Sequence, residues 1–167
     1  MWHPCFLLPD STKYLTLSEM LSGQEKDGDF EIEFSFYPSP VDIRKFAKIA
    51  RNIVELYWPE NEKAGFEVEV CIMEALTNVF LHAQNDKPVS EISFRLEKQL
   101  NKLIVRVFDD GRGFVLAEQL AKKPDVFQSS GRGLFLMDSF MDSIKYTTGK
   151  NRNELLIEKL ILGSKSV

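Results

Sequence analysis

Residues 68–83 read Val-Glu-Val-Cys-Ile-Met-Glu-Ala-Leu-Thr-Asn-Val-Phe-Leu-His-Ala, and this pattern predicts a helix that is apolar on most of its sides. Glu74, Asn78 and His82 are spaced four residues apart, so they form one narrow polar stripe along the helix. A helix of this kind is usually buried, and polar groups that are buried together need hydrogen-bond partners. Two interpretations are equally open: the stripe is solvated at the edge of a sheet, or it faces a ligand.

The three side chains of the stripe are suited to phosphate chemistry. The carboxamide oxygen of Asn78 is a hard ligand of the kind that Mg²⁺ prefers. Glu74, one turn earlier, is able to orient and deprotonate a hydroxyl group or a water molecule. His82 is able to hydrogen-bond to Asn78 or to a phosphate group.

A second candidate segment, residues 109–114, reads Asp-Asp-Gly-Arg-Gly-Phe and follows a predicted apolar strand. Gly111 and Gly113 would let the backbone approach a ligand closely. The carboxylate of Asp109 is able to accept a hydrogen bond from an exocyclic amine such as that of adenine. Asp-Gly is also a common turn dipeptide, so an ordinary turn is the alternative.

A third segment, residues 129–134, reads Ser-Ser-Gly-Arg-Gly-Leu and runs directly into a predicted helix. Gly131 and Gly133 beside the free N–H groups of a helix start would form a phosphate-binding site. Serine and glycine also cap ordinary helices, which is the alternative here. Neither glycine loop completes a P-loop or a dinucleotide-binding fingerprint.

The order of the predicted elements indicates the fold class. Strands are expected over 30–36, 90–97, 102–109, 144–148 and 154–162, and helices over 40–56, 62–84 and 134–143, with a short helix within 115–130. The strand pair 90–97 and 102–109 is joined too tightly for a parallel crossover, and strands and helices are segregated along the chain. We therefore expect an α+β two-layer sandwich, with a mostly antiparallel sheet that carries helices on one face.

Composition indicates one globular domain. The 167 residues are 44% hydrophobic, include 13 Phe and carry a net charge of −4, so the bulk of the chain can bury a core. The acidic balance argues against a nucleic acid ligand, and no window approaches the ~18 apolar residues of a membrane span. Cys5 and Cys71 cannot form a disulfide framework, and the start lacks a basic signal region, so we expect a cytoplasmic protein. Residues 1–29 are expected to be an N-terminal extension to a domain over 30–163.

The three motifs, taken together and in this order, resemble those of the GHKL ATPase superfamily and, within it, of the bacterial anti-sigma factor serine-protein kinases. Residues 74–83 resemble the N box of that family, residues 109–114 its first glycine box and residues 131–142 its second. The resemblance spans roughly residues 30–161 and implies a Bergerat-type ATP-binding fold.

The resemblance implies a role for each motif residue. Asn78 would hold Mg²⁺ at the phosphates of ATP, and Glu74 would be the base that activates an acceptor serine. Asp109 would bind the adenine amine, and residues 115–130 would be the ATP lid. The remaining nucleotide-binding residues would be Gly111 and Gly113 along the base, and His82, Gly131, Arg132, Gly133 and Leu134 toward the phosphates.

The resemblance implies a serine/threonine kinase that uses ATP and Mg²⁺, phosphorylates an anti-sigma-factor antagonist and sequesters a sigma factor. It also implies a homodimer, without nucleic acid or membrane partners. The alternative is a module, with or without nucleotide, that acts only by sequestering its partner. Glu74 and Asn78 favour the kinase. The alternative is favoured by the segment before the last strand, which reads Gly149-Lys-Asn-Arg-Asn-Glu-Leu155 where the family usually has a Gly-Thr pair.

Overall fold

The computed structural model describes residues 28–37, 39–83, 92–120, 132–150 and 152–162 of the chain. Within these ranges, five strands form one sheet in the order β1-β2-β3-β5-β4, and every neighbouring pair is antiparallel. The strands are β1 (Phe30–Phe36), β2 (Ile92–Gln99), β3 (Lys102–Asp109), β4 (Ser143–Thr147) and β5 (Asn153–Leu160).

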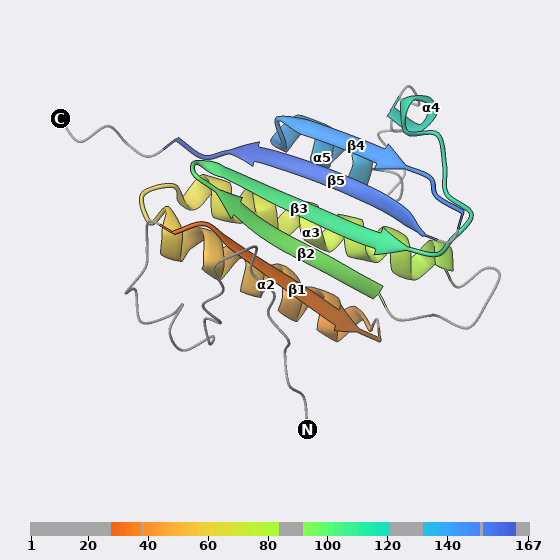
Figure 1. Cartoon of the computed structure of the whole chain (residues 1–167), viewed down its shortest axis with the longest axis horizontal. Helices are drawn as coiled ribbons and strands as arrows, with labels where there is room; N and C mark the ends of the chain where they lie inside the picture. The colour runs from red at the N-terminus through yellow and green to blue at the C-terminus, as the bar shows by residue number, and fades with distance from the viewer. Residues whose placement is uncertain (1–27, 38, 84–91, 121–131, 151, 163–167) are drawn as a thin grey trace.

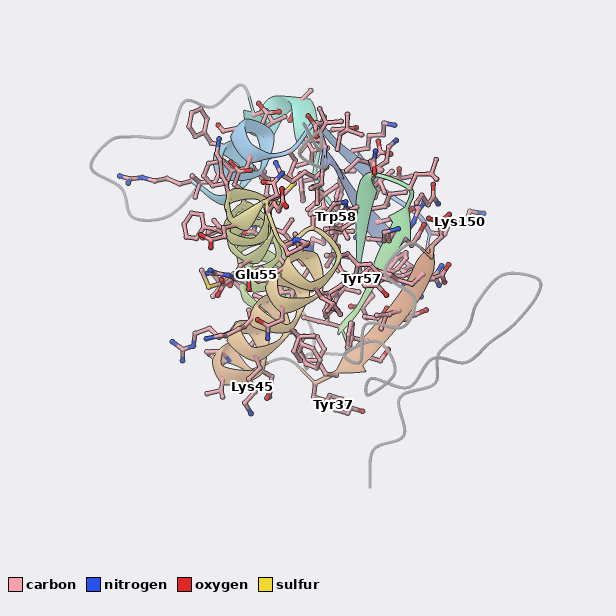
Figure 2. All side chains as sticks on the ribbon, turned by 90° about the vertical axis from the view of Figure 1, so that its left-hand side faces the viewer. Tyr37, Lys45, Glu55, Tyr57, Trp58 and Lys150 are labelled. Atoms are coloured by element: carbon pink, nitrogen blue, oxygen red, sulfur yellow. The ribbon has the colours of Figure 1, made fainter. Side chains whose placement is uncertain are left out.

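The helices lie on one face of this sheet, which confirms the predicted α+β two-layer sandwich. Figure 1 shows α2 (Pro40–Tyr57) and α3 (Glu62–Ala83) behind β1 to β3, and α5 (Gly133–Phe140) behind β5 and β4. The short helix α4 (Leu116–Leu120) lies beside the end of β4 (Figure 1). In Figure 2 the helices and the sheet form separate layers, and Tyr57 and Trp58 lie on the side of α2 that is toward the sheet.

The core lies between the two layers because each element presents its apolar residues at its own period. In β1 the buried residues Phe30, Ile32 and Phe36 follow the strand period of two. Helix α2 buries five apolar side chains along one side, at helical spacing, namely Ile43, Ala47, Ala50, Ile53 and Val54. The ring of Phe34 stacks on that of Phe94, with centroids 4.9 Å apart, which joins β1 to β2.

The start of α2 is determined locally. The hydroxyl oxygen of Ser39 accepts a hydrogen bond from the backbone N–H of Asp42 over 3.1 Å, and Pro40 begins the first turn. Serine as N-cap followed by proline is a strong helix-start signal. This explains why the predicted and observed starts of α2 agree.

The face of the sheet without helices carries ion pairs. The Arg95 guanidinium lies 3.1 Å from Glu31 and 2.8 Å from Glu33. Farther across the sheet, Arg106 bonds to Glu97 and to Glu154, at 2.6 and 2.5 Å. These cross-strand pairs keep this face polar and support the strand register.

Two described residues before β1 contact the β2–β3 hairpin. The Lys98 ammonium donates to the carbonyl of Gly28 over 3.0 Å, and the N–H of Leu100 donates to Asp29 over 2.6 Å. Leu100 has a φ of 54°, as the tight turn between the strands requires. Residues 1–27 of the expected N-terminal extension lie outside the described part of the chain.

The predicted helix over 134–143 is too long at its C-terminal end. Helix α5 stops at Phe140, and Met141 is extended, with φ −105° and ψ 152°. The N–H of Asp142 donates to the carbonyl of Glu158, and its carboxylate accepts from the N–H of Leu160. These bonds to β5 draw residues 141–142 away from the helix. Such a tertiary effect cannot be predicted from the local spacing of apolar residues.

No helix in the described ranges is long and apolar enough to cross a membrane.

Candidate functional site

Glu74 and Asn78 lie one turn apart on α3, and both are partly buried. The side chain of Glu74 packs against Gly133, the first residue of α5. A Cβ atom at Gly133 would lie 2.5 Å from Glu74 Oε2 and 3.2 Å from Glu74 Cβ. A side chain at this position would therefore require the Glu74 carboxylate to move away from the start of α5. The structure thus brings together a residue of the first motif and a residue of the third.

The start of α5 presents backbone N–H groups. Arg132 precedes the helix with φ −89° and ψ −14°, and its side chain makes no capping hydrogen bond. Leu134 packs against the core, which anchors the first turn. Gly131 lies outside the described residues, and so do residues 121–130 of the expected lid. The described part of the expected lid, residues 115–120, contains α4. His82 belongs to α3, but its side chain is outside the described part.

Asp109 is the centre of a hydrogen-bond network at the end of β3. Its Oδ1 atom accepts from the backbone N–H of Gly111 over 2.8 Å and from the amide of Asn153 over 2.9 Å. Its Oδ2 atom accepts from the hydroxyl of Tyr146 over 3.3 Å. The carboxylate therefore acts only as an acceptor and has donors on both oxygens.

Two further contacts shape the loop after Asp109. Gly113 has a φ of 72°, and a Cβ atom there would lie 2.7 Å from Thr148 Cγ2, so both the backbone and the space require glycine. The ring of Phe114 stacks on Tyr146 with centroids 4.0 Å apart. The first glycine motif is therefore packed against the end of β4 rather than being an isolated turn.

Tyr146 keeps its proton over a wide pH range. Burial raises the pKa of its hydroxyl above the usual value, and the negative charge of Asp109 raises it further. The neutral hydroxyl is therefore a stable hydrogen-bond donor to Asp109.

The ends of several elements meet at one end of the sheet. Asp109 pairs with Asn153, and Thr147 pairs with Glu154, so the end of β3, the start of β5 and the end of β4 are adjacent. Figure 1 shows the C-terminal end of α3 at this same end of the molecule. The polar stripe of α3 and the Asp109 network thus belong to one region of the fold.

The donor set of this region suits a nucleotide and a hard cation. Asn78 offers a neutral carboxamide oxygen, and Asp109 offers a carboxylate of fixed orientation. In the described ranges, no three His, Cys, Asp or Glu side chains gather as a protein-only metal site would need. A cation beside Asn78 would therefore take most of its ligands from phosphate oxygens and water.

Sequence reasoning missed two members of this region, Tyr146 and Asn153. Tyr146 lies in the predicted strand 144–148, and Asn153 directly precedes the predicted strand 154–162, but neither residue was assigned a role in the site. The signal that could have indicated Asn153 was its place at the start of the last strand, where the expected Gly-Thr pair is absent.

Cys71 lies on α3 near the stripe but takes no part in it. Its side chain is 1% exposed, and burial raises the pKa of its thiol to about 12. The thiol is therefore neutral and packs as a small apolar group.

Comparisons with known proteins show which family the chain resembles. Residues 36–159 match the family described as histidine kinase-like ATPase domain. The anti-sigma F factor of Clostridium acetobutylicum is 31% identical over 99 residues, which are 56% of this chain and 67% of that protein. The serine-protein kinase RsbW of Listeria innocua is 30% identical over 97 residues, 50% of this chain and 62% of that protein.

A solved structure shares the fold. A chain in the crystal structure of the SiaB–SiaC complex from Pseudomonas aeruginosa superposes with a TM-score of 0.56. The match covers 89% of this chain and 100% of that chain at 14% sequence identity, so it shows likeness of fold alone.

Proposed function

Because the chain belongs to the family of histidine kinase-like ATPase domains, in the branch of the anti-sigma factor serine-protein kinases, we propose that it is an ATP-dependent serine/threonine-protein kinase. Its substrate is an anti-sigma-factor antagonist, and it sequesters a sigma factor in a partner switch that follows its ATP or ADP state. The observation that carries the proposal is the acceptor-only carboxylate of Asp109, which Gly111 and Asn153 hold at the end of β3. Such a group recognises an exocyclic amine on a base.

In this proposal the adenine base lies at Asp109. The carboxylate accepts the adenine amine, and Gly111 and Gly113 lie along the base. The positive φ of Gly113 and its close contact with Thr148 support this role, because they keep the loop close to the sheet.

The phosphates lie at the start of α5. The N–H groups of its first turn, together with Gly131, Arg132 and Gly133, neutralise the charge of the phosphates. Leu134 anchors that turn in the core, and His82 lies toward the phosphates. Asn78 supplies a carboxamide oxygen to Mg²⁺, whose positive charge lowers the barrier to phosphoryl transfer when it is bound.

Glu74 is the base of the reaction. It accepts the hydroxyl proton of the acceptor serine, whose oxygen forms a bond to the γ-phosphorus. The bond from phosphorus to the bridging oxygen breaks, and ADP leaves. The packing of Glu74 against Gly133 supports this role, because it keeps the carboxylate beside the first turn of α5.

Calorimetric titration with ATP, with and without Mg²⁺, tests nucleotide binding. We expect one ATP per chain and tighter binding with Mg²⁺, and we expect Asn78→Ala to abolish the effect of Mg²⁺. Asn52→Ala, at an exposed position of α2, is the matched control and should bind as the wild type does. Absence of ATP binding by the wild-type protein would contradict the proposal.

Transfer of phosphate to a co-purified antagonist protein tests the role of Glu74. We expect Glu74→Gln to bind ATP as tightly as the wild type and to lose transfer by roughly 10²-fold or more, because the proton acceptor is gone. Glu62→Gln, at an exposed position of the same helix, should transfer phosphate at the wild-type rate. If Glu74→Gln also transfers phosphate at the wild-type rate, Glu74 is not the base.

The second candidate function is sequestration of a partner without phosphate transfer. The replacement of the Gly-Thr pair before β5 favours it. It predicts a stable complex with the partner and no phosphorylated antagonist at any ATP concentration.

We also propose that the protein is a cytoplasmic homodimer, as the resemblance to the family implies. Sedimentation velocity of the purified protein tests the dimer, and a monomer at all concentrations would contradict it.

A further inference from the structure

The two oxygens of the Asp109 carboxylate are unequally occupied. Oδ1 accepts two hydrogen bonds, from the N–H of Gly111 at 2.8 Å and from the Asn153 amide at 2.9 Å. Oδ2 accepts a longer hydrogen bond of 3.3 Å from the Tyr146 hydroxyl. Since each carboxylate oxygen has about two acceptor positions, the capacity left for a ligand is on Oδ2.

Asn153 is the side chain that produces this asymmetry. It is only 2% exposed, and its Nδ2 atom donates both to Asp109 Oδ1 and to the carbonyl oxygen of Gly111 over 2.9 Å. Because both neighbours are oxygen acceptors, only the NH₂ end of the amide can face them. Asn153 thus ties the start of β5 to the carboxylate and to the glycine loop at once.

Fixing the carboxylate in this way has a chemical consequence for the base. A purine with a 6-amino group presents a donor to Oδ2, and the two form a hydrogen bond. A purine with a 6-oxo group places an acceptor at the same position, and it must shift to bring its N1–H donor to Oδ2, so it binds less tightly to a carboxylate of fixed orientation. A carboxylate that is free to rotate loses part of this discrimination, because its orientation is no longer maintained.

Resting on the proposed function, we infer that Asn153 is a positioning residue that determines which base is bound. It acts through Asp109 rather than by touching the nucleotide. The substrate class that it selects is the 6-amino purine nucleoside triphosphates over the 6-oxo ones. The hydrogen bonds that carry this inference join residues 44 and 42 positions apart in the chain.

Calorimetric titration with ATP and with inosine triphosphate tests the inference, because these nucleotides differ only at the edge of the base that carries position 6 and N1. The wild type should bind ATP more tightly. Asn153→Ala and Asn153→Leu should each lower the ratio of the two affinities by roughly tenfold, because the hydrogen bond that holds the Asp109 carboxylate is lost. If Asn153 only stabilised the fold, its substitution would weaken the binding of both nucleotides equally and leave the ratio of the affinities unchanged.

Two further variants keep the test decisive. Asn153→Leu has nearly the size of the natural side chain and carries neither a donor nor a charge, so it decides the question if Asn153→Ala does not fold. Asn101→Ala makes the same substitution in the exposed β2–β3 turn, where it should leave the ratio at the wild-type value.

The outcomes separate this inference from the proposed function. If the wild type prefers ATP and the folded Asn153 variants prefer it equally, only the inference is overturned. A wild type that binds both nucleotides with equal affinity overturns the inference and the role of Asp109 in recognising the adenine amine, whereas ATP binding and phosphate transfer still stand. If the wild type binds neither nucleotide, the proposed function falls, and the inference falls with it.

Discussion

Cys71 and Tyr146 show how burial changes the chemistry of single side chains in this protein. The pKa of each is raised above its usual value, chiefly by burial. For Cys71 the consequence is an unreactive thiol in the core. For Tyr146 it is a permanently neutral donor to Asp109. The two residues therefore differ in role because the hydroxyl of Tyr146 donates a hydrogen bond to a residue of the candidate site, whereas the thiol of Cys71 packs in the core.

Stability at alkaline pH should report the environment of Tyr146. Its folded pKa lies above the unfolded value of about 10, so its stabilising contribution is complete below that pH and is lost as pH rises further. We expect Tyr146→Phe to lose about 1 kcal/mol at neutral pH, from the hydrogen bond to Asp109, and to show a weaker fall of stability above about pH 10.

Urea unfolding of both proteins at a series of pH values measures this difference. The other three tyrosines are common to both proteins, so their titration cancels in the comparison. Parallel pH profiles for the two proteins would show that Tyr146 titrates as in an unfolded chain.

At the scale of elements, the contact between α3 and α5 determines the geometry of the candidate site. Helix α5 can begin beside Glu74 because its first residue, Gly133, has no side chain. The same helix ends at Phe140, where the following residues join β5. Both ends of α5 are therefore determined by its neighbours, and the helix is only eight residues long.

Substitution of Gly133 tests this contact. In Gly133→Ala the new Cβ would lie 2.5 Å from Glu74 Oε2 and 3.2 Å from Glu74 Cβ, so Glu74 or α5 must move. We expect a net loss of about 1 kcal/mol, because overpacking exceeds the gain in helix propensity. Urea unfolding measures the change.

Ser139→Ala, at an exposed position of the same helix, is the control for helix propensity. It should change stability by no more than about 0.5 kcal/mol. A Gly133→Ala protein that is more stable than the wild type would show that α5 does not press against Glu74.

At the scale of the whole molecule, one buried ammonium group joins three elements. Lys159 of β5 lies 2.7 Å from Glu67 of α3, and it donates to the carbonyl oxygen of Phe140, at the end of α5, over 2.7 Å. The two charged side chains are only 13% and 10% exposed. The helical layer is thus attached to the sheet by a polar contact as well as by the apolar core.

Removing one partner of this pair should be costly. Lys159→Met keeps the aliphatic stem but leaves Glu67 without its closest cation, so we expect a loss of about 3 kcal/mol. In the double variant Glu67→Gln with Lys159→Met the uncompensated charge is gone, so the loss should be smaller than the sum of the single losses. Urea unfolding of the four proteins gives this coupling.

Lys145→Met is the matched control, because Lys145 is 66% exposed and lies 3.9 Å from Glu158. It should cost less than about 1 kcal/mol. Equal losses at Lys159 and Lys145 would show that the three-element contact does not stabilise the fold.

The sequence by itself determined the elements and the three motifs. Alternation in residues 30–36 and helical spacing in residues 40–56 predict β1 and α2 because these periods reflect which side of each element is buried. Ser39 and Pro40 indicate the start of α2 because capping involves only neighbouring residues. The sequence could identify Asp109, Gly111 and Gly113 as candidate site residues because they are neighbours in one short loop, where the N–H of Gly111 donates to Asp109.

Only the tertiary structure decided which distant residues complete the site. Tyr146 and Asn153 reach Asp109 across 37 and 44 positions of the chain, and Gly133 reaches Glu74 from another helix. The early end of α5 has the same origin, since Asp142 bonds to β5. Periodicity and motifs describe neighbours along the chain, whereas these contacts exist because the antiparallel sheet and the packing of α5 on α3 bring separate segments together.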